Sequence, residues 1–226
     1  MGIPRYALER IAPYLKGARV LSLSYPDLVV HPKDIEVIFG FTPTKFTAHN
    51  NWHGCNHPLP ETKEVMGRVC ASFDCVDVVK HRGVERIVDL NETCDLGSYD
   101  LVLDPGTTEH CFNIGTAMMS AANAVAVGGR IMHLVPVSMI NHGFWNVCPT
   151  TMHDFYTQNG WEIEALEIYA RDKAGDKFIG NLRDNPTGRY SVWKEAGMMC
   201  LARRMSEARM KPPIQSKYVS MMKAAA

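Results

Sequence analysis

Two short apolar runs in the middle of the chain end in aspartates, and a glutamate and a histidine follow the second run. The stretch VDLNETCDLGSYDLVLDPGTTEHCFN, residues 88–113, holds Asp89, Asp104, Glu109 and His110 in this arrangement. Carboxylates accept hydrogen bonds from ligands, and an imidazole has an unperturbed pKa near neutrality that suits it to accept a proton. If both runs are strands, we expect these side chains at the sheet edge where ligands bind.

A second histidine-bearing stretch is VPVSMINHGFWNVCP, which contains Asn141, His142, Phe144 and Trp145. It follows another apolar run, so it is expected to overhang the mouth of a pocket. Its mixture of polar and aromatic groups is typical of a substrate wall or a lid. The alternative is a loop that buries Phe144 and Trp145 in the core.

A third stretch, HNNWHGCNHP, contains His49, His53, Cys55 and His57. Imidazoles four residues apart and a nearby thiol are chemically able to hold zinc, but their spacing matches no structural zinc motif. We therefore expect no metal here and interpret His53 as part of a polar substrate wall.

Apolar runs bounded by polar turns, and apolar residues at helical spacing, define the elements that must position these groups. Strands are predicted at 18–23, 73–79, 85–90, 99–104, 130–137, 161–171 and 197–205, and helices at 6–15, 31–40, 113–127 and 149–160. This alternation predicts an α/β fold: a mostly parallel, seven-stranded Rossmann-like sheet with helices on both faces and a terminal antiparallel strand pair.

The length of 226 residues and the 46% hydrophobic content are consistent with one domain over residues 1–226. Residues 31–69, rich in Pro, His, Asn and Gly, are interpreted as an insertion around the core. Residues 206–226 form a weakly patterned C-terminal tail, in which Met221 and Met222 are candidates for contact with a partner subunit. A homo-oligomer is therefore possible on the sequence alone.

The charge balance and hydropathy exclude several classes of partner. Lys plus Arg and Asp plus Glu both number 24, which argues against a surface built to bind nucleic acid. No apolar run approaches the roughly 20 residues that cross a bilayer, and the N-terminus lacks the pattern of a signal peptide. We expect a cytoplasmic protein with a small-molecule substrate, no membrane partner, and seven reduced cysteines.

The order of the motifs ARVLSLS, IVDLN, YDLVLDPGTTEH and VGGRIMHLVP, followed by a terminal strand pair, resembles a class I S-adenosylmethionine-dependent methyltransferase. The resemblance covers residues 18–30 and 73–205, whereas residues 31–69 match nothing in the general family pattern. It implies S-adenosylmethionine as cofactor, and methyl transfer to oxygen or nitrogen of a polar small molecule or sugar-like acceptor.

The resemblance also implies where the cofactor lies. Its amino-acid end would lie in the loop after the first strand, its ribose beside Asp77, and its adenine between Asp89 and Leu90. The candidate cofactor-binding residues are Ser22, Ser24, Tyr25, Asp27, Asp77, Asp89, Leu90, Asp104 and Gly106. The alternatives are solvated strand ends or helix caps for Asp77 and Asp89, and a turn-forming role for Asp104 beside Gly106.

One departure from the family lies in LSLSYPD, where Ser24 and Pro26 replace the glycines that allow positive φ and close backbone approach. Asp27 is expected to supply the missing acid, with Tyr25 as a wall. The missing glycines also argue against a dinucleotide-binding G-x-G-x-x-G motif, and so against a nicotinamide dehydrogenase.

The candidate catalytic residues are Glu109, His110 and His142. Connections after the fourth and fifth strands leave the same edge of a doubly wound sheet, so His110 and His142 are predicted to converge on one pocket. One histidine would take the acceptor's proton while the other orients the acceptor. The alternative is that both only stabilise their own turns.

Two other functions compete with methyl transfer. The missing glycines are also consistent with a non-catalytic binding protein that keeps the methyltransferase fold. The third possibility is a metal-dependent enzyme that uses the cluster between His49 and His57.

Overall fold

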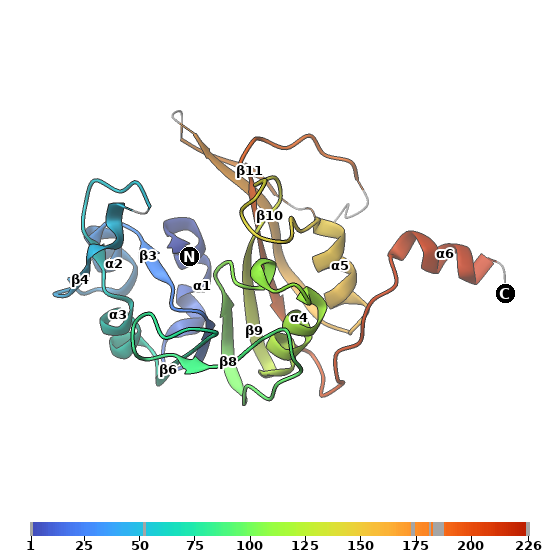
Figure 1. The fold of residues 1–226 in the computed structure, drawn as a ribbon, viewed down its shortest axis with the longest axis horizontal. Coiled ribbons are helices and arrows are strands. Elements are labelled where there is room, and N and C mark those ends of the chain that lie inside the picture. Colours follow the sequence, from blue (N-terminus) through green and yellow to red (C-terminus); the bar gives the residue numbers. More distant parts are fainter. Residues whose placement is uncertain (1, 52, 173–174, 181, 183–187, 225–226) are drawn as a thin grey trace.

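The computed structural model describes residues 2–51, 53–172, 175–180, 182 and 188–224 (Figure 1). Its centre is an eight-stranded sheet with the order β11-β10-β12-β9-β8-β2-β6-β7. These strands are β2 (Arg19–Leu23), β6 (Ser72–Asp77), β7 (Arg86–Ile87), β8 (Tyr99–Asp104), β9 (Val125–Pro136), β10 (Glu162–Asp172), β11 (Gly175–Ile179) and β12 (Gly197–Arg203).

The helices and the shorter strands surround this sheet. The helices are α1 (Arg5–Leu15), α2 (Pro32–Phe39), α3 (Thr62–Val69), α4 (Ile114–Asn123), α5 (Pro149–Thr157), α6 (Ser216–Ala224) and the 3₁₀ helices η1 (Ala48–Asn51) and η2 (Thr108–His110). The shorter strands form two pairs, β1 (Gly2–Pro4) with β3 (Asp27–Val29) and β4 (Phe46–Thr47) with β5 (Leu59–Pro60).

The predicted α/β class and the mostly parallel sheet are confirmed. Strands β7, β6, β2, β8 and β9 run parallel, whereas β12 is antiparallel to both β9 and β10. The sheet has eight strands instead of the predicted seven, because β11 forms a hairpin with β10. The carboxyl ends of β2, β6, β8 and β9 therefore meet at one edge.

Helices cover both faces of the sheet, as predicted. Leu21 and Val102 belong to the core beneath α4 and α5, whereas the alternate residues Val20, Leu101 and Leu103 belong to the core beneath α1 and α3. This division follows from the alternation of side chains along a strand. None of the helices in the described part of the chain has the length and apolar character needed to traverse a bilayer.

Several predicted boundaries differ from the structure. Helix α4 ends at Asn123 instead of residue 127, because β9 begins at Val125 and the Arg204 guanidinium binds the carbonyls of Asn123 and Val125. Strand β7 stops at Ile87 instead of residue 90, and a turn follows in which the Asp89 carboxylate accepts the Asn91 N–H.

A further difference is helix α3, which the sequence did not predict. Its buried Val65 and Met66 pack into the core on the α1 side, and the helix contacts β6. The end of the 31–69 segment is thus the crossover between β2 and β6. The predicted helix 31–40 is confirmed as α2, which begins at Pro32 and stops at Gly40, where φ is 78°.

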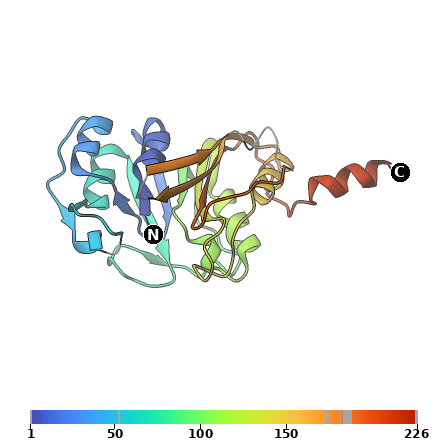
Figure 2. The same ribbon diagram turned by 90° about the horizontal axis from the view of Figure 1, so that it is seen from above.

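The C-terminal tail extends away from the sheet, and both views show α6 projecting from the body (Figures 1 and 2). Gln158 and Asn159 hold the chain before α6 through hydrogen bonds with the backbones of Ile214 and Lys211. On α6 itself, Met221 and Met222 are 63% and 59% exposed. Their contact with a partner subunit stays a prediction.

The loop after β2 keeps a glycine-like backbone without glycine. Ser24 has a φ of 73°, in the left-handed region that non-glycine residues occupy at a cost. Three contacts hold it: the Ser24 N–H donates to the Val76 carbonyl at 2.6 Å, the Ser22 hydroxyl donates to the Ser24 carbonyl at 2.7 Å, and the Thr107 hydroxyl lies 3.0 Å from the Ser24 hydroxyl.

Substitutions at Ser24 test this conformation. Ser24→Gly should leave the free energy of unfolding within about 1 kcal/mol of wild type, because relief of backbone strain offsets the lost hydroxyl contact. Ser24→Val should lower it by about 2 kcal/mol or more, since a β-branched residue fits poorly at this φ. Urea denaturation measures both, and equal stability of the two variants would contradict the strain.

Candidate functional site

The Asp104 carboxylate organises the chain beyond β8. One of its oxygens accepts hydrogen bonds from the N–H groups of Thr107 and Thr108 at 2.9 and 3.2 Å, which shapes the turn into η2. The other oxygen accepts the Thr108 hydroxyl at 2.6 Å and lies 2.6 Å from Nδ1 of His133 on β9. The ring of His133 in turn lies 2.5 Å, through Nε2, from the Tyr156 hydroxyl on α5.

This polar chain lies wholly inside the protein, because Asp104, His133 and Tyr156 are all 0% exposed. Burial raises the pKa of Asp104, but the hydrogen bond and the charge of His133 outweigh it and bring that pKa below its usual value. Burial also raises the pKa of Tyr156 well above its usual value. Asp104 therefore stabilises the turn that carries Glu109 and His110. This is the turn-forming role that the sequence offered as the alternative to cofactor binding.

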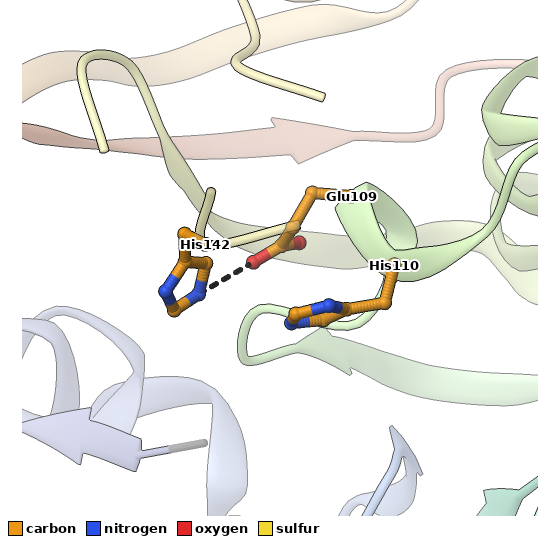
Figure 3. Close-up of side chains that lie close together, drawn as sticks. All are labelled: Glu109, His110 and His142. Carbon is orange, nitrogen blue, oxygen red and sulfur yellow. Dashed lines mark ion pairs between the residues drawn. The ribbon is translucent and has the colours of Figure 1, made fainter. Parts of the chain in front are cut away.

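Glu109, His110 and His142 lie together beyond the carboxyl ends of β8 and β9 (Figure 3). The Glu109 Oε1 atom is 3.6 Å from Nε2 of His142, and the rings of His110 and His142 have centroids 5.2 Å apart. The two histidine rings are thus close together, as predicted, whereas their convergence on one pocket stays a prediction. Glu109 is 1% exposed, whereas both histidines are exposed.

The environment changes the protonation of two members of this cluster. Burial, together with the negative charge of Asp104, raises the pKa of Glu109 to about 8. Burial, together with the neighbouring His142, lowers the pKa of His110. Near neutral pH the Glu109 carboxyl accordingly carries a proton for much of the time, and His110 is a neutral ring able to accept one.

The loop that carries His142 is attached to the backbone of Glu109. The Glu109 carbonyl accepts the N–H groups of Phe144 at 2.9 Å and Trp145 at 3.3 Å, and the Trp145 indole N–H donates to the Cys111 carbonyl at 3.1 Å. Gly143 permits this approach, because a Cβ there would lie 2.8 Å from the Glu109 carbonyl oxygen. The spacing of Glu109 and His142 is therefore built into the fold.

A cleft of about 1100 Å³ adjoins this cluster. Three of the predicted residues line it: His53, Asn141 and His142. The remainder of its lining includes charged and polar groups from distant segments, among them Arg5, Asp34, His31, Tyr169 and Lys194. Apolar side chains, among them Val29, Val30 and Ile140, share the lining, so the cleft suits a ligand that has both polar and apolar parts.

Phe144 and Trp145 do not line this cleft and are not buried in the core. They are 66% and 41% exposed and pack against Phe112, whose ring centroid is 5.7 Å from that of Phe144 and 6.4 Å from that of Trp145. Phe112 itself is 70% exposed and was not predicted as a site residue. The sequence feature that could have indicated Phe112 is its position two residues after His110, since exposed aromatic groups beside a site often contact ligands.

Four of the candidate cofactor-binding residues have partners inside the protein. Ser22 is 0% exposed, and the Tyr25 hydroxyl binds the Glu61 carboxylate and the Lys63 N–H. Asp27 and Ser24 are also buried, and Asp27 lies in an ion-pair network described below. The structure gives these side chains structural contacts, so their cofactor contacts stay predictions.

The remaining candidates lie at or near the carboxyl edge. Asp77 is partly buried and accepts the Val79 N–H at 3.3 Å, and Asp89 is exposed. Leu90 is buried in the core beneath α4, and Gly106 has a φ of 96° in the turn after Asp104. Neither Asp77 nor Asp89 lines the large cleft, so a ribose and adenine held by them would lie beside it.

The histidines of the 49–57 segment are bound to protein groups. The Asp27 carboxylate lies 3.0 Å from Nε2 of His53 and 3.3 Å from Nδ1 of His49, and it also pairs with the Arg82 guanidinium. Burial raises the pKa of Asp27, but these partners bring it below its usual value. His57 lies 3.1 Å from the Pro58 carbonyl oxygen through Nδ1.

No protein-family model matches the chain, and no curated protein sequence matches it. Solved structures are similar to it. A protein from Bacillus halodurans named as a candidate methyltransferase is 9% identical, with a TM-score of 0.42, over 89% of this chain and 99% of that one. An S-adenosylmethionine-dependent methyltransferase from Clostridium acetobutylicum is 8% identical, with a TM-score of 0.31, over 61% of this chain and 76% of that one.

An O-methyltransferase family protein from Burkholderia thailandensis is 13% identical, with a TM-score of 0.33, over 90% of this chain and 59% of that one. The described sheet has the parallel strands and the terminal antiparallel pair that the sequence resemblance implied. The order and directions of these strands are those of the class I methyltransferase fold.

Tyr156→Phe tests the buried polar chain of this methyltransferase fold. Loss of the hydroxyl leaves Nε2 of His133 without its buried partner, so the free energy of unfolding should fall by about 1–3 kcal/mol. The matched control is Tyr218→Phe on α6, whose side chain is 49% exposed and which should leave stability unchanged. Urea denaturation of both variants is the measurement. If the two variants changed the free energy of unfolding by similar amounts, the Tyr156–His133 hydrogen bond would not contribute to stability as expected.

Gly143→Ala tests the attachment of the His142 loop. The added methyl group would meet the Glu109 backbone, so the loop must shift and stability should fall by about 1–3 kcal/mol. Gly115→Ala is the control, because Gly115 lies on α4 with nothing within 4 Å of an added Cβ. That change should raise stability by up to about 1 kcal/mol. Thermal unfolding compares the two, and a neutral Gly143→Ala would show that the loop is not tightly attached.

Proposed function

We propose that the protein is an S-adenosylmethionine-dependent methyltransferase that acts on oxygen or nitrogen of a polar small molecule or sugar-like acceptor. The observation that carries the proposal is the Glu109–His110–His142 cluster, which lies beyond β8 and β9 beside a cleft with charged, polar and apolar lining groups in a methyltransferase fold. The similarity of the chain to methyltransferase structures is consistent with it.

The groups at the carboxyl edge fit the chemistry of the cofactor. The carboxylates of Asp77 and Asp89 are acceptors suited to the ribose hydroxyls and the adenine amino group. Val78 and Phe112 are 64% and 70% exposed and offer apolar surface for the adenine ring. When bound, S-adenosylmethionine supplies an activated methyl group to a nucleophile aligned with its sulfonium.

The histidine cluster would prepare that nucleophile. An acceptor in the cleft loses its proton to the cluster, where His110 is a neutral ring at neutral pH and His142 borders the cleft directly. The acceptor then forms a bond to the methyl carbon as the carbon–sulfur bond breaks, and the electron pair leaves on sulfur. Alignment of the acceptor by Asn141 and His53 would contribute through proximity.

A second function is favoured by the loop after β2. Because Ser22, Ser24 and Thr107 form hydrogen bonds with one another there, the loop has fewer polar groups available to bind the cofactor's amino-acid end. This feature is consistent with a non-catalytic protein that binds a different ligand in the same fold. Cofactor binding separates the two functions.

Isothermal titration calorimetry with S-adenosylmethionine and S-adenosylhomocysteine tests the proposal. We expect saturable binding of one molecule, weakened by about 1–3 kcal/mol in Asp77→Ala because a charged acceptor is lost. Glu207→Ala, which removes an exposed carboxylate beyond β12, should bind as wild type. Absence of binding to the folded wild-type protein would refute methyl transfer and leave the binding protein.

Turnover is then measured with labelled cofactor and a panel of hydroxyl and amine acceptors. His110→Asn and His142→Asn should each reduce the rate by about 10²-fold or more at unchanged cofactor affinity. If both variants bind the cofactor and turn over normally, the two histidines serve only their own turns.

A further inference from the structure

The Glu109–His110–His142 cluster has the composition of a metal site. Each residue offers one ligand atom, and these atoms all lie within 4.8 Å of one another. Two imidazoles and one carboxylate are a donor set that catalytic zinc sites use, and they also suit other divalent transition metals. In the part of the chain that the structure describes, no other group of histidine, cysteine, aspartate and glutamate side chains meets this criterion.

The distances are close to those that a bound ion requires. Ligand atoms about 2.1 Å from a tetrahedral zinc ion lie about 3.4 Å from one another. The Glu109 Oε1 and His142 Nε2 atoms are already 3.6 Å apart. The other separations between ligand atoms are at most 4.8 Å, and the three side chains lie close together in Figure 3.

An unsatisfied buried oxygen points independently to a missing ligand. The Oε2 atom of Glu109 is buried and has no hydrogen-bond partner among the described residues. A carboxyl oxygen left in this state costs free energy, because it has lost its water without gaining a partner. A cation held by the carboxylate and the two imidazoles would provide the compensating interaction.

The backbone holds the cluster in place before any ion arrives. The Glu109 carbonyl accepts hydrogen bonds from the N–H groups of Phe144 and Trp145. These bonds hold the loop that carries His142 against η2. Both ligand-bearing segments follow strands of the same parallel pair, β8 and β9. Such pre-organised support is what a metal site with an open coordination position requires.

We propose that Glu109, His110 and His142 form a binding site for one divalent transition-metal ion, of which zinc is the representative. With three protein ligands, a tetrahedral ion keeps one coordination position open. Because His142 and Asn141 line the cleft, the cleft lies next to the ion site.

The site also indicates the class of acceptor, a step that rests on the proposed methyl transfer. A hydroxyl group bound to the ion loses its proton near neutral pH, as metal-bound water does. With both imidazoles acting as ligands instead of bases, the proton of the oxygen–hydrogen bond would pass to water in the cleft. The bound oxygen would then form the bond to the methyl carbon as the carbon–sulfur bond of the cofactor breaks and the electron pair leaves on sulfur. The geometry therefore favours a hydroxyl acceptor over a protonated amine.

Metal binding is tested on the full chain without any assay of turnover. Chelator-treated protein is titrated with Co²⁺, whose visible absorption reports coordination, and with Zn²⁺ in competition. We expect one equivalent of either ion, and a loss of affinity of at least about 10-fold in each of Glu109→Gln, His110→Asn and His142→Asn. Circular dichroism verifies that each variant is folded.

His57→Asn is the matched control, because it removes a histidine from the other cluster, where Nδ1 contacts the Pro58 carbonyl. It should bind the ions as wild type. Absence of stoichiometric binding to the folded wild-type protein would overturn the proposal. So would binding that survives all three ligand substitutions, or that is lost in His57→Asn.

Calorimetry with S-adenosylhomocysteine on the metal-free and metal-loaded protein keeps the two proposals apart. Cofactor binding without metal binding overturns the metal site alone, and metal binding without cofactor binding overturns methyl transfer alone. With both ligands bound, preference for hydroxyl over amine acceptors in the metal-loaded protein would support the acceptor class, and equal rates would contradict it.

Discussion

The hydrogen bonds of the Asp104 carboxylate fix the position of almost everything else in the candidate site. A buried carboxylate is stable only when its oxygens are fully partnered, and Asp104 achieves this with Thr107, Thr108 and His133. The two threonines turn the chain at the end of β8, so that η2 begins immediately beyond the strand. His133 ties the same carboxylate to β9 and, through Tyr156, to α5.

That arrangement has an electrostatic consequence for the next residues of the chain. The charge of Asp104 and the burial of Glu109 disfavour a second negative charge, so the pKa of Glu109 rises to about 8. A proton or a cation is the natural partner of such a carboxyl. The same short segment thus contains one acid whose pKa is lowered and which serves the fold, Asp104, and one acid whose pKa is raised and which faces the histidines, Glu109.

Much of the fold follows from local sequence patterns, whereas the partners of polar groups do not. The apolar runs predicted β2, β6, β8 and the body of β9, and the parallel geometry of β8 and β9 was enough to bring His110 and His142 together. Helix α3 was missed because it lies in a segment whose composition resembles a loop. The ion pair between Asp27 and Arg82 could not be predicted, because the two residues are 55 positions apart and no local sequence pattern indicates their contact.

The loop after β2 shows how a departure in sequence can preserve a backbone conformation. Ser24 takes the positive φ that glycine would supply, and its neighbours stabilise it with hydrogen bonds. The Thr107 hydroxyl, which binds the Leu23 carbonyl, lies against this loop. The close backbone approach that glycines would give a ligand is therefore partly replaced by contacts within the protein, and a cofactor there must depend more on the ends of β6 and β7.

The chain contains two groups of histidines, and their partners decide which one is available for chemistry. In the 49–57 segment, His49 and His53 compensate the buried Asp27 charge, an interaction that would have to break before a metal could bind. Beyond β8 and β9, by contrast, Glu109 retains an unpartnered oxygen and the two imidazoles remain exposed beside it. Identical residue types thus serve stability in one place and leave coordination capacity in the other. The Asp27 carboxylate is already paired with cationic protein groups, whereas the Glu109 carboxyl keeps an oxygen without a hydrogen-bond partner.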